Sequence, residues 1–461
     1  MMSPPKIVDV SALINGRRLG AFNYRLIVLS WLITAFDGFD MMVIGFTLPY
    51  MHDQLGLSKV QGGIVVSSGL VGMMLGGFLL SYLGDRAGRR PTLIGAALAF
   101  GVLTAAISLA GSYHALLALR FIDGLALGGM LPLAWALNIE FVPSSMRSTV
   151  VTVIMMGYSV GTAIAGPMTN WIAPTHGWQG VYLAGGIGSL VCAAGLWLVL
   201  PESVRFLAAK GQRPELLYRT LKSLDPVLEI SPTDRFVVAD EIATERGFRP
   251  AQLFRGDLRA ITPLLWLGYF CSSLAIYFVA SWGPTLVEEL HFPRQTAALV
   301  ASAGSLLGAV AGLLLMRFTD RRGAGCVAFY PALAVPVLLV MGFGLVPHAV
   351  FLPFAILSVV LISGGHFGIL SLAGVYYPSS IRASGAGWAT SVAKFGAILG
   401  PILGGLVLSS GSVLHSYAQL ALFPAILCAC ALGMGAMLRR RTAPVPAAAL
   451  ASALSVSGEP P

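Results

Sequence analysis

Residues 84–91 read GDRAGRRP and residues 319–326 read TDRRGAGC, so an Asp-Arg pair followed by a glycine recurs in the second half of the chain, with Asp320 in the place of Asp85. At the same offset PSSMR, at residues 143–147, returns as PSSIR at 378–382, and Trp31 returns as Trp266. Several matches in one register indicate an internal repeat. The chain is therefore predicted to consist of two similar halves in the same orientation.

The composition indicates a membrane protein. Of the 461 residues 56% are hydrophobic and only 11% are charged, whereas a soluble domain carries about 25% charged residues. Nineteen of the 49 charged residues fall between residues 201 and 260, and long apolar runs flank that segment. Such a chain lacks the polar surface that a water-soluble body needs.

Twelve apolar runs are long enough to cross a bilayer as helices, since a spanning helix needs about 20 apolar residues. Continuous runs favour helices over a barrel, whose strands would alternate in hydrophobicity. Glycines spaced four apart, as at Gly124 and Gly128, predict close helix contacts. The predicted spans are 26–49, 62–83, 92–111, 115–138, 150–173, 181–200, 261–284, 296–316, 326–346, 350–373, 384–409 and 416–437.

Basic residues set the predicted orientation. Of 29 lysines and arginines, only Lys59 and Arg294 fall in loops on one side, and 25 fall on the other. The positive-inside rule then places both termini in the cytoplasm. The predicted parts are a cytoplasmic N-terminus (1–25), a first six-helix half (26–200), a cytoplasmic linker with some surface helix (201–260), a second half (261–437) and a disordered tail (438–461).

These features resemble the major facilitator superfamily. GDRAGRRP is similar to its D-R-x-G-R-R loop signature, and Arg120, Gly124 and Gly128 are similar to its fourth-helix signature. The resemblance implies an all-α membrane protein of twelve transmembrane helices in two pseudo-symmetric halves. The basic residues are scattered over loops and not gathered on a soluble face, so nucleic-acid binding is not expected. The five cysteines lack metal-site spacing, and neither a metal nor a cofactor is expected.

Charged residues in the loops of the signature side predict a gate. Ion pairs there can close the cytoplasmic side in one state and break in the other, although the same charges would also serve to fix topology. The candidate gating residues are Asp85, Arg86, Arg89, Arg90, Glu140, Arg147, Asp320, Arg321 and Arg382.

Two carboxylates inside the first span predict proton coupling. Asp37 and Asp40 form D-G-F-D and lie on one helix face. Two carboxylates this close, away from bulk water, tend to share a proton because the second ionisation is disfavoured. The alternative, an aspartate that bonds backbone at Gly38, fits one residue better than two. Arg120 and Asp123, inside the fourth span, are expected to pair with each other as a structural unit.

Lys394 in the eleventh span and His366 in the tenth are candidate substrate contacts. An ammonium at that depth needs an internal carboxylate or an anionic substrate, and the substrate is favoured. His366 is equally compatible with a proton relay, a substrate donor or a hydrogen-bonded core residue.

The first-span segment DGFDMMVIGFTLPYM, at residues 37–51, resembles the aromatic acid:proton symporter family, whose first helix carries D-G-x-D. Further matches include PESVRFL at 201–207 and YPSSIRASGAGWATSVAKFGAILGPILGG at 377–405. The resemblance implies import of benzoate, a hydroxybenzoate or a related ring acid with protons, with Asp37 and Asp40 as the essential pair. Aromatic walls for the ring are expected from Phe36, Phe39, Trp388 and Tyr277.

The expected protein is therefore a monomeric carrier of the inner membrane and not an enzyme, with an aromatic carboxylate, protons and the lipid bilayer as its partners. Two alternatives remain. One is a proton-antiport exporter, whose fifth-span glycine-proline pattern is only partial here. The other is a membrane sensor of aromatic acids that does not transport them.

Overall fold

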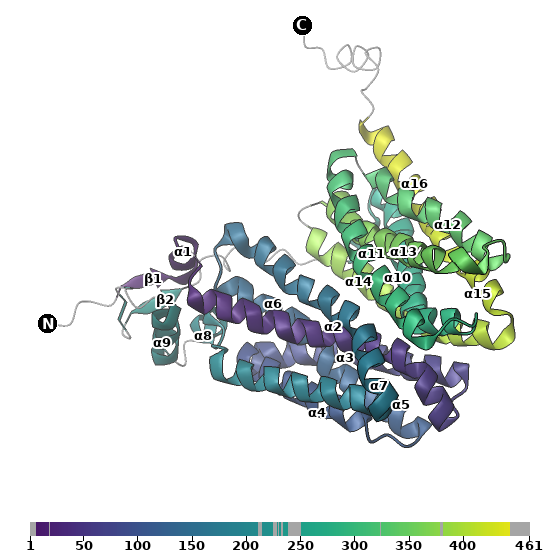
Figure 1. Cartoon of the computed structure of the whole chain (residues 1–461). Helices are drawn as coiled ribbons and strands as arrows, with labels where there is room; N and C mark the ends of the chain where they lie inside the picture. The colour runs from purple at the N-terminus through teal and green to yellow at the C-terminus, as the bar shows by residue number, and fades with distance from the viewer. Residues whose placement is uncertain are drawn as a thin grey trace, which may run out of the picture.

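The computed structural model describes residues 6–17, 19–210, 214–224, 228, 230–231, 234–237, 250–322, 324–378 and 381–442. These residues form two bundles of long helices (Figure 1). Ser379, Ser380 and the predicted tail from residue 443 onward lie outside the described residues.

The first bundle is built from six helices. Their bounds are α2 (Ala21–Leu55), α3 (Lys59–Ala87), α4 (Arg89–Ile107), α5 (Tyr113–Leu127), α6 (Met130–Glu140) and α7 (Arg147–Val199). α5 and α6 follow each other along one crossing that breaks at Gly128 and Gly129. Local sequence sets the helix starts. Ser58 caps α3, because its hydroxyl accepts from the backbone N–H of Gln61 at 3.2 Å and its own N–H donates back to the Gln61 side chain at 2.9 Å.

α7 contains two membrane crossings. At 53 residues it would be about 80 Å long if it were straight, and it bends at Gly177, which has a φ of 66°. Gly157 and Gly161 contact α2 near Trp31 and Ala35, whereas later glycines of α7 contact α2 in the reverse order, Gly185 at Phe39, Gly188 at Phe36 and Gly195 at Leu29. The chain therefore turns back along α2 after Gly177, as the two predicted spans require.

The second bundle contains the remaining six crossings. Its helices are α10 (Leu258–Glu288), α11 (Arg294–Arg322), α12 (Phe329–Gly342) after the 3-10 turn η4 (Ala324–Ala328), α13 (Phe351–Tyr376), which follows η5 (His348–Val350), α14 (Arg382–Ser410), α15 (Val413–Leu420) and α16 (Leu422–Thr442). Eleven helical segments of the described chain are long and apolar enough to span a membrane, and α7 supplies two crossings. The prediction of twelve transmembrane helices is confirmed.

Glycines bring the helix backbones together, as their spacing predicts. A Cβ on Gly124 would collide with the backbone of Gly69, and one on Gly128 with the backbone of Met73, so α5 lies directly against α3. In α14, Gly396 meets the backbone of Phe270 and Gly400 that of Leu274 on α10 in the same way. Small residues at helix interfaces let the backbones approach closely, which favours helix association in lipid.

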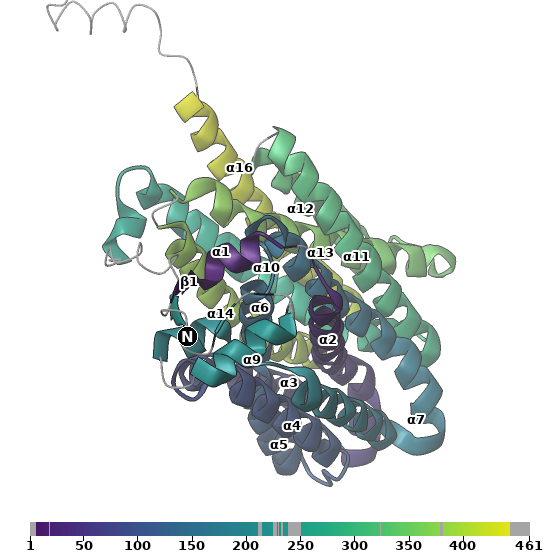
Figure 2. The ribbon, with the colours of Figure 1, turned by 90° about the vertical axis from the view of Figure 1, so that its left-hand side faces the viewer.

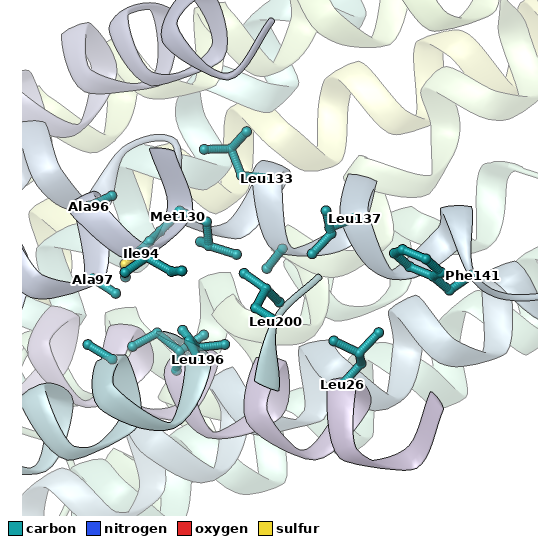
Figure 3. Close-up of a cluster of buried hydrophobic side chains, with 14 of the residues drawn as sticks. Leu26, Ile94, Ala96, Ala97, Met130, Leu133, Leu137, Phe141, Leu196 and Leu200 are labelled. Carbon is teal, nitrogen blue, oxygen red and sulfur yellow. The ribbon is translucent and has the colours of Figure 1, made fainter. Parts of the chain in front are cut away.

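The interior of the first bundle is apolar. Figure 3 shows side chains from α2, α4, α6 and α7 meeting in one cluster, with Leu26, Leu137 and Leu196 among them. Large apolar side chains also point outward, for example Phe78, Trp171 and Leu198, which are 69%, 81% and 80% exposed. Exposed apolar side chains over the whole length of the helices fit a surface that faces lipid.

The two bundles meet at one end and diverge at the other (Figure 1). We call the end where they meet the Lys59 end and the opposite end, which carries α9 (Pro214–Leu224), the α9 end. Gly45 touches the backbone of Ala280, Gly63 touches that of Pro401, and Gly166 touches that of Ala298. The offset that relates Asp85 to Asp320 also relates Gly45 to Ala280, and it converts the pair Gly63–Pro401 into Ala298–Gly166. The contact between the bundles therefore follows the internal repeat.

A small folded unit covers the first bundle at the α9 end (Figure 2). Strand β1 (Ile7–Asp9) pairs in parallel with β2 (Arg235–Val237), and α1 (Val10–Asn15), α8 (Val204–Lys210) and α9 pack beside them. The Asp234 carboxylate accepts backbone N–H bonds from Ser231 and Lys6, which lower the pKa of that carboxyl. The central segment thus contributes structure beyond the expected surface helix, because it pairs with the N-terminal strand.

Candidate transport site

Asp37 and Asp40 lie deep in α2 and are each 1% exposed. The Asp40 carboxylate accepts a hydrogen bond from Nη1 of Arg120 on α5 at 2.7 Å. Both carboxylate oxygens of Asp37 are buried without a hydrogen-bond partner in the described part of the chain. The two aspartates share a helix face but have different surroundings.

Arg120 connects three helices. Besides Asp40, its guanidinium contacts Asp123 at 3.6 Å and donates to the Tyr182 hydroxyl of α7 at 2.5 Å. Asp123 in turn accepts from the Thr104 hydroxyl of α4 at 3.2 Å. The expected pair of Arg120 and Asp123 is present, but Asp40 is the closer partner. Sequence reasoning missed this, and it missed Tyr182 as well.

The buried cluster carries more acidic than basic groups. Asp40 and Asp123 contact one guanidinium, Asp37 lies one turn from Asp40 on the same helix, and all four residues are at most 5% exposed. If every carboxylate were ionised, the cluster would hold two uncompensated negative charges away from water, which is costly. Bound protons remove that cost. Protonation of Asp37 breaks no hydrogen bond or ion pair among the described residues, because its carboxylate has no partner there.

A cavity of about 140 Å³ lies between the bundles beside this cluster. Its walls come from α2, α7, α10, α11 and α13, and they include Met41, Tyr158, Tyr277, Ser363 and His366. An apolar cavity of about 150 Å³ is known to hold benzene, so the volume suits a single ring. Met41 is one turn beyond Asp37 on the same face of α2, which places the acidic cluster next to the cavity.

Two of the predicted contacts line this cavity, namely Tyr277 and His366. The others lie elsewhere. Phe39 and Phe36 pack on α7 at Gly185 and Gly188. Trp388 is 44% exposed and stacks on Trp266 with 6.0 Å between the ring centres. These three rings belong to helix packing in this conformation.

Lys394 does not line the cavity either. It is half-buried on α14, and its Nζ lies 3.6 Å from where a Cβ on Gly77 of α3 would be. It therefore reaches from the second bundle to the glycine crossing of the first. The described residues provide no carboxylate within ion-pair distance of it.

Among the candidate gating residues of the first bundle, Arg89 and Glu140 contact each other, and Glu140 and Arg90 contact the start of the central segment. Arg89 forms an ion pair with Glu140, whose carboxylate also accepts from the Ser203 hydroxyl at 2.5 Å. Arg90 donates from Nε to the Leu200 carbonyl at 2.6 Å. Asp85 and Arg86 are exposed, the Arg86 guanidinium lies over the Tyr82 ring, and Arg147 has a buried Nε without a partner among the described atoms.

In the second bundle, Arg382 donates to the carbonyl of Tyr377 at 3.2 Å. Asp320 and Arg321 belong to α11, but their side chains lie outside the described part of the structure. Among the described residues, no hydrogen bond or ion pair joins a candidate gating residue at the α9 end to the opposite bundle. The two bundles are linked at the Lys59 end.

Two ion pairs link the bundles at the Lys59 end, and sequence reasoning did not identify them. Lys59 pairs with Glu289 at 2.5 Å, and Arg294 pairs with Asp53 at 3.0 Å. Lys59 and Arg294 are the two basic residues assigned to the loops of that side, and they occupy the same position in the two halves of the repeat. Their repeat relationship is the signal that would have found them.

Comparisons with known proteins agree with this fold. The chain belongs to the major facilitator superfamily, whose pattern matches residues 30–376. Within it the chain is of the aromatic acid transporter type, and it is a transporter, not an enzyme.

Similar proteins support the assignment to the aromatic acid transporter type. The gallate transporter of Pseudomonas putida is 33% identical over 96% of this chain and 99% of that protein. The 4-hydroxybenzoate transporter PcaK of Pseudomonas aeruginosa is 32% identical over 91% and 94%. Among solved structures, a D-xylose-proton symporter matches with a TM-score of 0.70 at 18% identity, covering 90% of this chain and 97% of that one. This last likeness shows the fold alone.

Proposed function

We propose that this protein imports an aromatic carboxylic acid together with protons by alternating access. The similar transporters named for gallate and 4-hydroxybenzoate support an aromatic acid as substrate. A cavity of single-ring size between the two bundles supports a central site that either bundle can expose.

The observation that supports coupling of transport to protons is the environment of the Asp37 carboxylate. Its carboxylate is buried, has no partner among the described atoms and adjoins the Asp40–Arg120 pair. A carboxylate in this position is far better accommodated with a proton than without one. Asp37 is therefore the member of the acidic pair that loads and releases the coupled proton, while Asp40 is held by Arg120.

Lys394 does not line the cavity in this conformation, and we propose that it anchors the substrate carboxylate in another conformation of the transport cycle. Its ammonium is half-buried and has no acidic partner within ion-pair distance among the described residues. A cation at membrane depth without a counterion favours an anionic ligand. Lys394 belongs to the second bundle and Asp37 to the first. Binding of the acid at Lys394 and of the proton at Asp37 would therefore involve both bundles.

The α9 end is proposed to face the cytoplasm, since most basic residues outside the helices lie there. Both the N-terminal strand and the central segment lie at that end. Both termini would then lie inside the cell, and this conformation would open toward the cytoplasm. The proposed protein acts as a monomer in the inner membrane.

The experiment is proton uptake into proteoliposomes that hold a pH dye. Benzoate, 4-hydroxybenzoate, protocatechuate and gallate are added outside, and protein-free vesicles correct for passive entry of weak acid. Internal acidification that depends on the protein and on one of these acids is expected. Asp37→Asn is expected to lose proton-driven accumulation but to retain exchange of labelled substrate across the membrane.

Asp234→Asn is the matched control, because it makes the same carboxylate-to-amide change outside the membrane helices. It is expected to transport like the unmodified protein. Full concentrative uptake by Asp37→Asn would contradict the role of Asp37, and the absence of movement for every acid would contradict the substrate class.

A further inference from the structure

The side chain of His366 is held in one orientation by a chain of hydrogen bonds. Its Nδ1 lies 3.2 Å from the hydroxyl oxygen of Ser272 on α10. The Ser272 hydroxyl donates its hydrogen to the carbonyl of Tyr269 at 3.0 Å. A serine hydroxyl has a single hydrogen, so the remaining interaction requires Nδ1 of His366 to carry the hydrogen and to donate it to Ser272.

This assignment fixes the character of the other ring nitrogen. A neutral imidazole has one donor and one acceptor, and with Nδ1 as donor, Nε2 is an acceptor. No aspartate or glutamate is present among the described residues that line the cavity, so no carboxylate there favours a charged ring. Nε2 has no hydrogen-bond partner in the described part of the chain, and His366 lines the cavity.

The remaining walls indicate which part of a substrate this cavity receives. The described lining contains no lysine or arginine, but it does contain Tyr158, Tyr277 and Ser363 together with apolar side chains. Such a site suits the ring of an aromatic acid better than its carboxylate, which needs a cation or strong donors. Ser363 lies three residues before His366 on α13, so both reach the same side of the cavity.

We propose that Nε2 of His366 accepts a hydrogen bond from a ring hydroxyl of the substrate, so that the carrier selects phenolic acids over acids with an unsubstituted ring. This rests on the proposed function and adds a selectivity to it. His366 then acts neither as a proton relay nor as a donor. A ring without a hydroxyl would leave a buried acceptor unpaired, and the cost of that unpaired acceptor weakens its binding.

The test compares ligands that differ in one donor. Equilibrium binding to the purified protein is measured for benzoate, 3- and 4-hydroxybenzoate and the matching methoxybenzoates, which keep the oxygen but cannot donate. At least one hydroxybenzoate is expected to bind roughly tenfold or more tightly than benzoate and its own methoxy analogue.

Variants then locate the source of this preference. His366→Phe keeps a ring of similar size without the acceptor, and its hydroxybenzoate-to-benzoate affinity ratio is expected to fall to about one with benzoate binding retained. Ser272→Ala frees the imidazole to exchange its hydrogen and is expected to reduce the ratio in part. Ser358→Ala is the control, because Ser358 makes a similar bond to the carbonyl of Ala355 on α13 but does not line the cavity.

Equal affinity of the unmodified protein for benzoate and both hydroxybenzoates would overturn the proposal, as would a preference that survives in His366→Phe. In either case the proposed transport of aromatic acids would stand. If none of the acids bound, the proposal for His366 would fall, and the proteoliposome experiment would decide the transport proposal independently of binding.

Discussion

Lys59 and Arg294, which the internal repeat relates, each form an ion pair with the opposite bundle. Lys59 reaches Glu289 at 2.5 Å and Arg294 reaches Asp53 at 3.0 Å. Lys59 also donates to the carbonyl of Leu408 at 3.3 Å. Because the two pairs run in opposite directions between the halves, they close the Lys59 end in a nearly two-fold symmetric way.

A charge reversal is expected to open the Lys59 end. Lys59→Glu places two carboxylates together at Glu289, and like charges in contact are unfavourable. The expected result is a longer distance between spin labels attached at residues 111 and 412, in the loops of that end, in a cysteine-free background. Each pair is partly exposed, at 27–29% for Lys59–Glu289, so a single neutralisation is expected to have a smaller effect than the reversal.

The double variant Lys59→Glu with Glu289→Lys restores opposite charges and is expected to return the short distance. Unchanged spin-label distances in the single reversal would show that the glycine contacts alone hold this end closed.

Breaking the Asp40–Arg120 pair is expected to destabilise the protein strongly. Arg120→Met leaves the buried carboxylates of Asp40 and Asp123 without their cation, and loss of one member of a buried pair costs about 3–5 kcal/mol. A marked fall in the detergent melting temperature is expected. Arg120→Met combined with Asp40→Leu removes the carboxylate that was closest to the lost cation and is expected to recover part of the loss. A double variant less stable than Arg120→Met would refute this interpretation.

The sequence predicts most of the fold because its signals are local. Apolar runs of about 20 residues give the twelve crossings, and the constant offset between the repeated motifs gives the two halves. The glycine spacing in α5 and α14 predicts the closest helix contacts, and these are present. The turn at Gly177 inside α7 is also consistent with two separate apolar runs on either side.

The partners inside the site are harder to predict, because they depend on how the helices rotate against each other. Arg120 and Asp123 are neighbours on one helix, but the closer partner, Asp40, belongs to a helix three crossings earlier in the chain and is brought in by helix packing. Phe36 and Phe39 flank Asp37 in sequence, yet they face α7 and not the cavity. α2 is apolar all round, so no amphipathic pattern shows which face meets the cavity.

Glu140 is expected to hold the central segment onto the first bundle. It is 3% exposed, pairs with Arg89 and accepts from the Ser203 hydroxyl. Glu140→Ala leaves those groups without their acceptor and is expected to raise hydrogen exchange over residues 201–210. Glu215→Ala is the control, since its pair with Arg219 is exposed and adds little. Equal exchange in both variants would show that the segment is held by its apolar contacts.

Lys394 is expected to bind substrate through its charge and not to stabilise the fold. Its Nζ lies beside Gly77, and no acidic partner is present among the described residues. Lys394→Met is therefore expected to weaken binding of the transported acid by roughly tenfold or more, the value of a charge-assisted hydrogen bond, with little change in melting temperature. Lys394→Arg keeps the charge and is expected to retain most of the affinity. Gly77→Val fills the space beside the ammonium, so it is expected to weaken binding even though the lysine is intact. A Lys394→Met protein that binds normally, or one that unfolds several degrees earlier, would instead assign this lysine to the contact between the bundles.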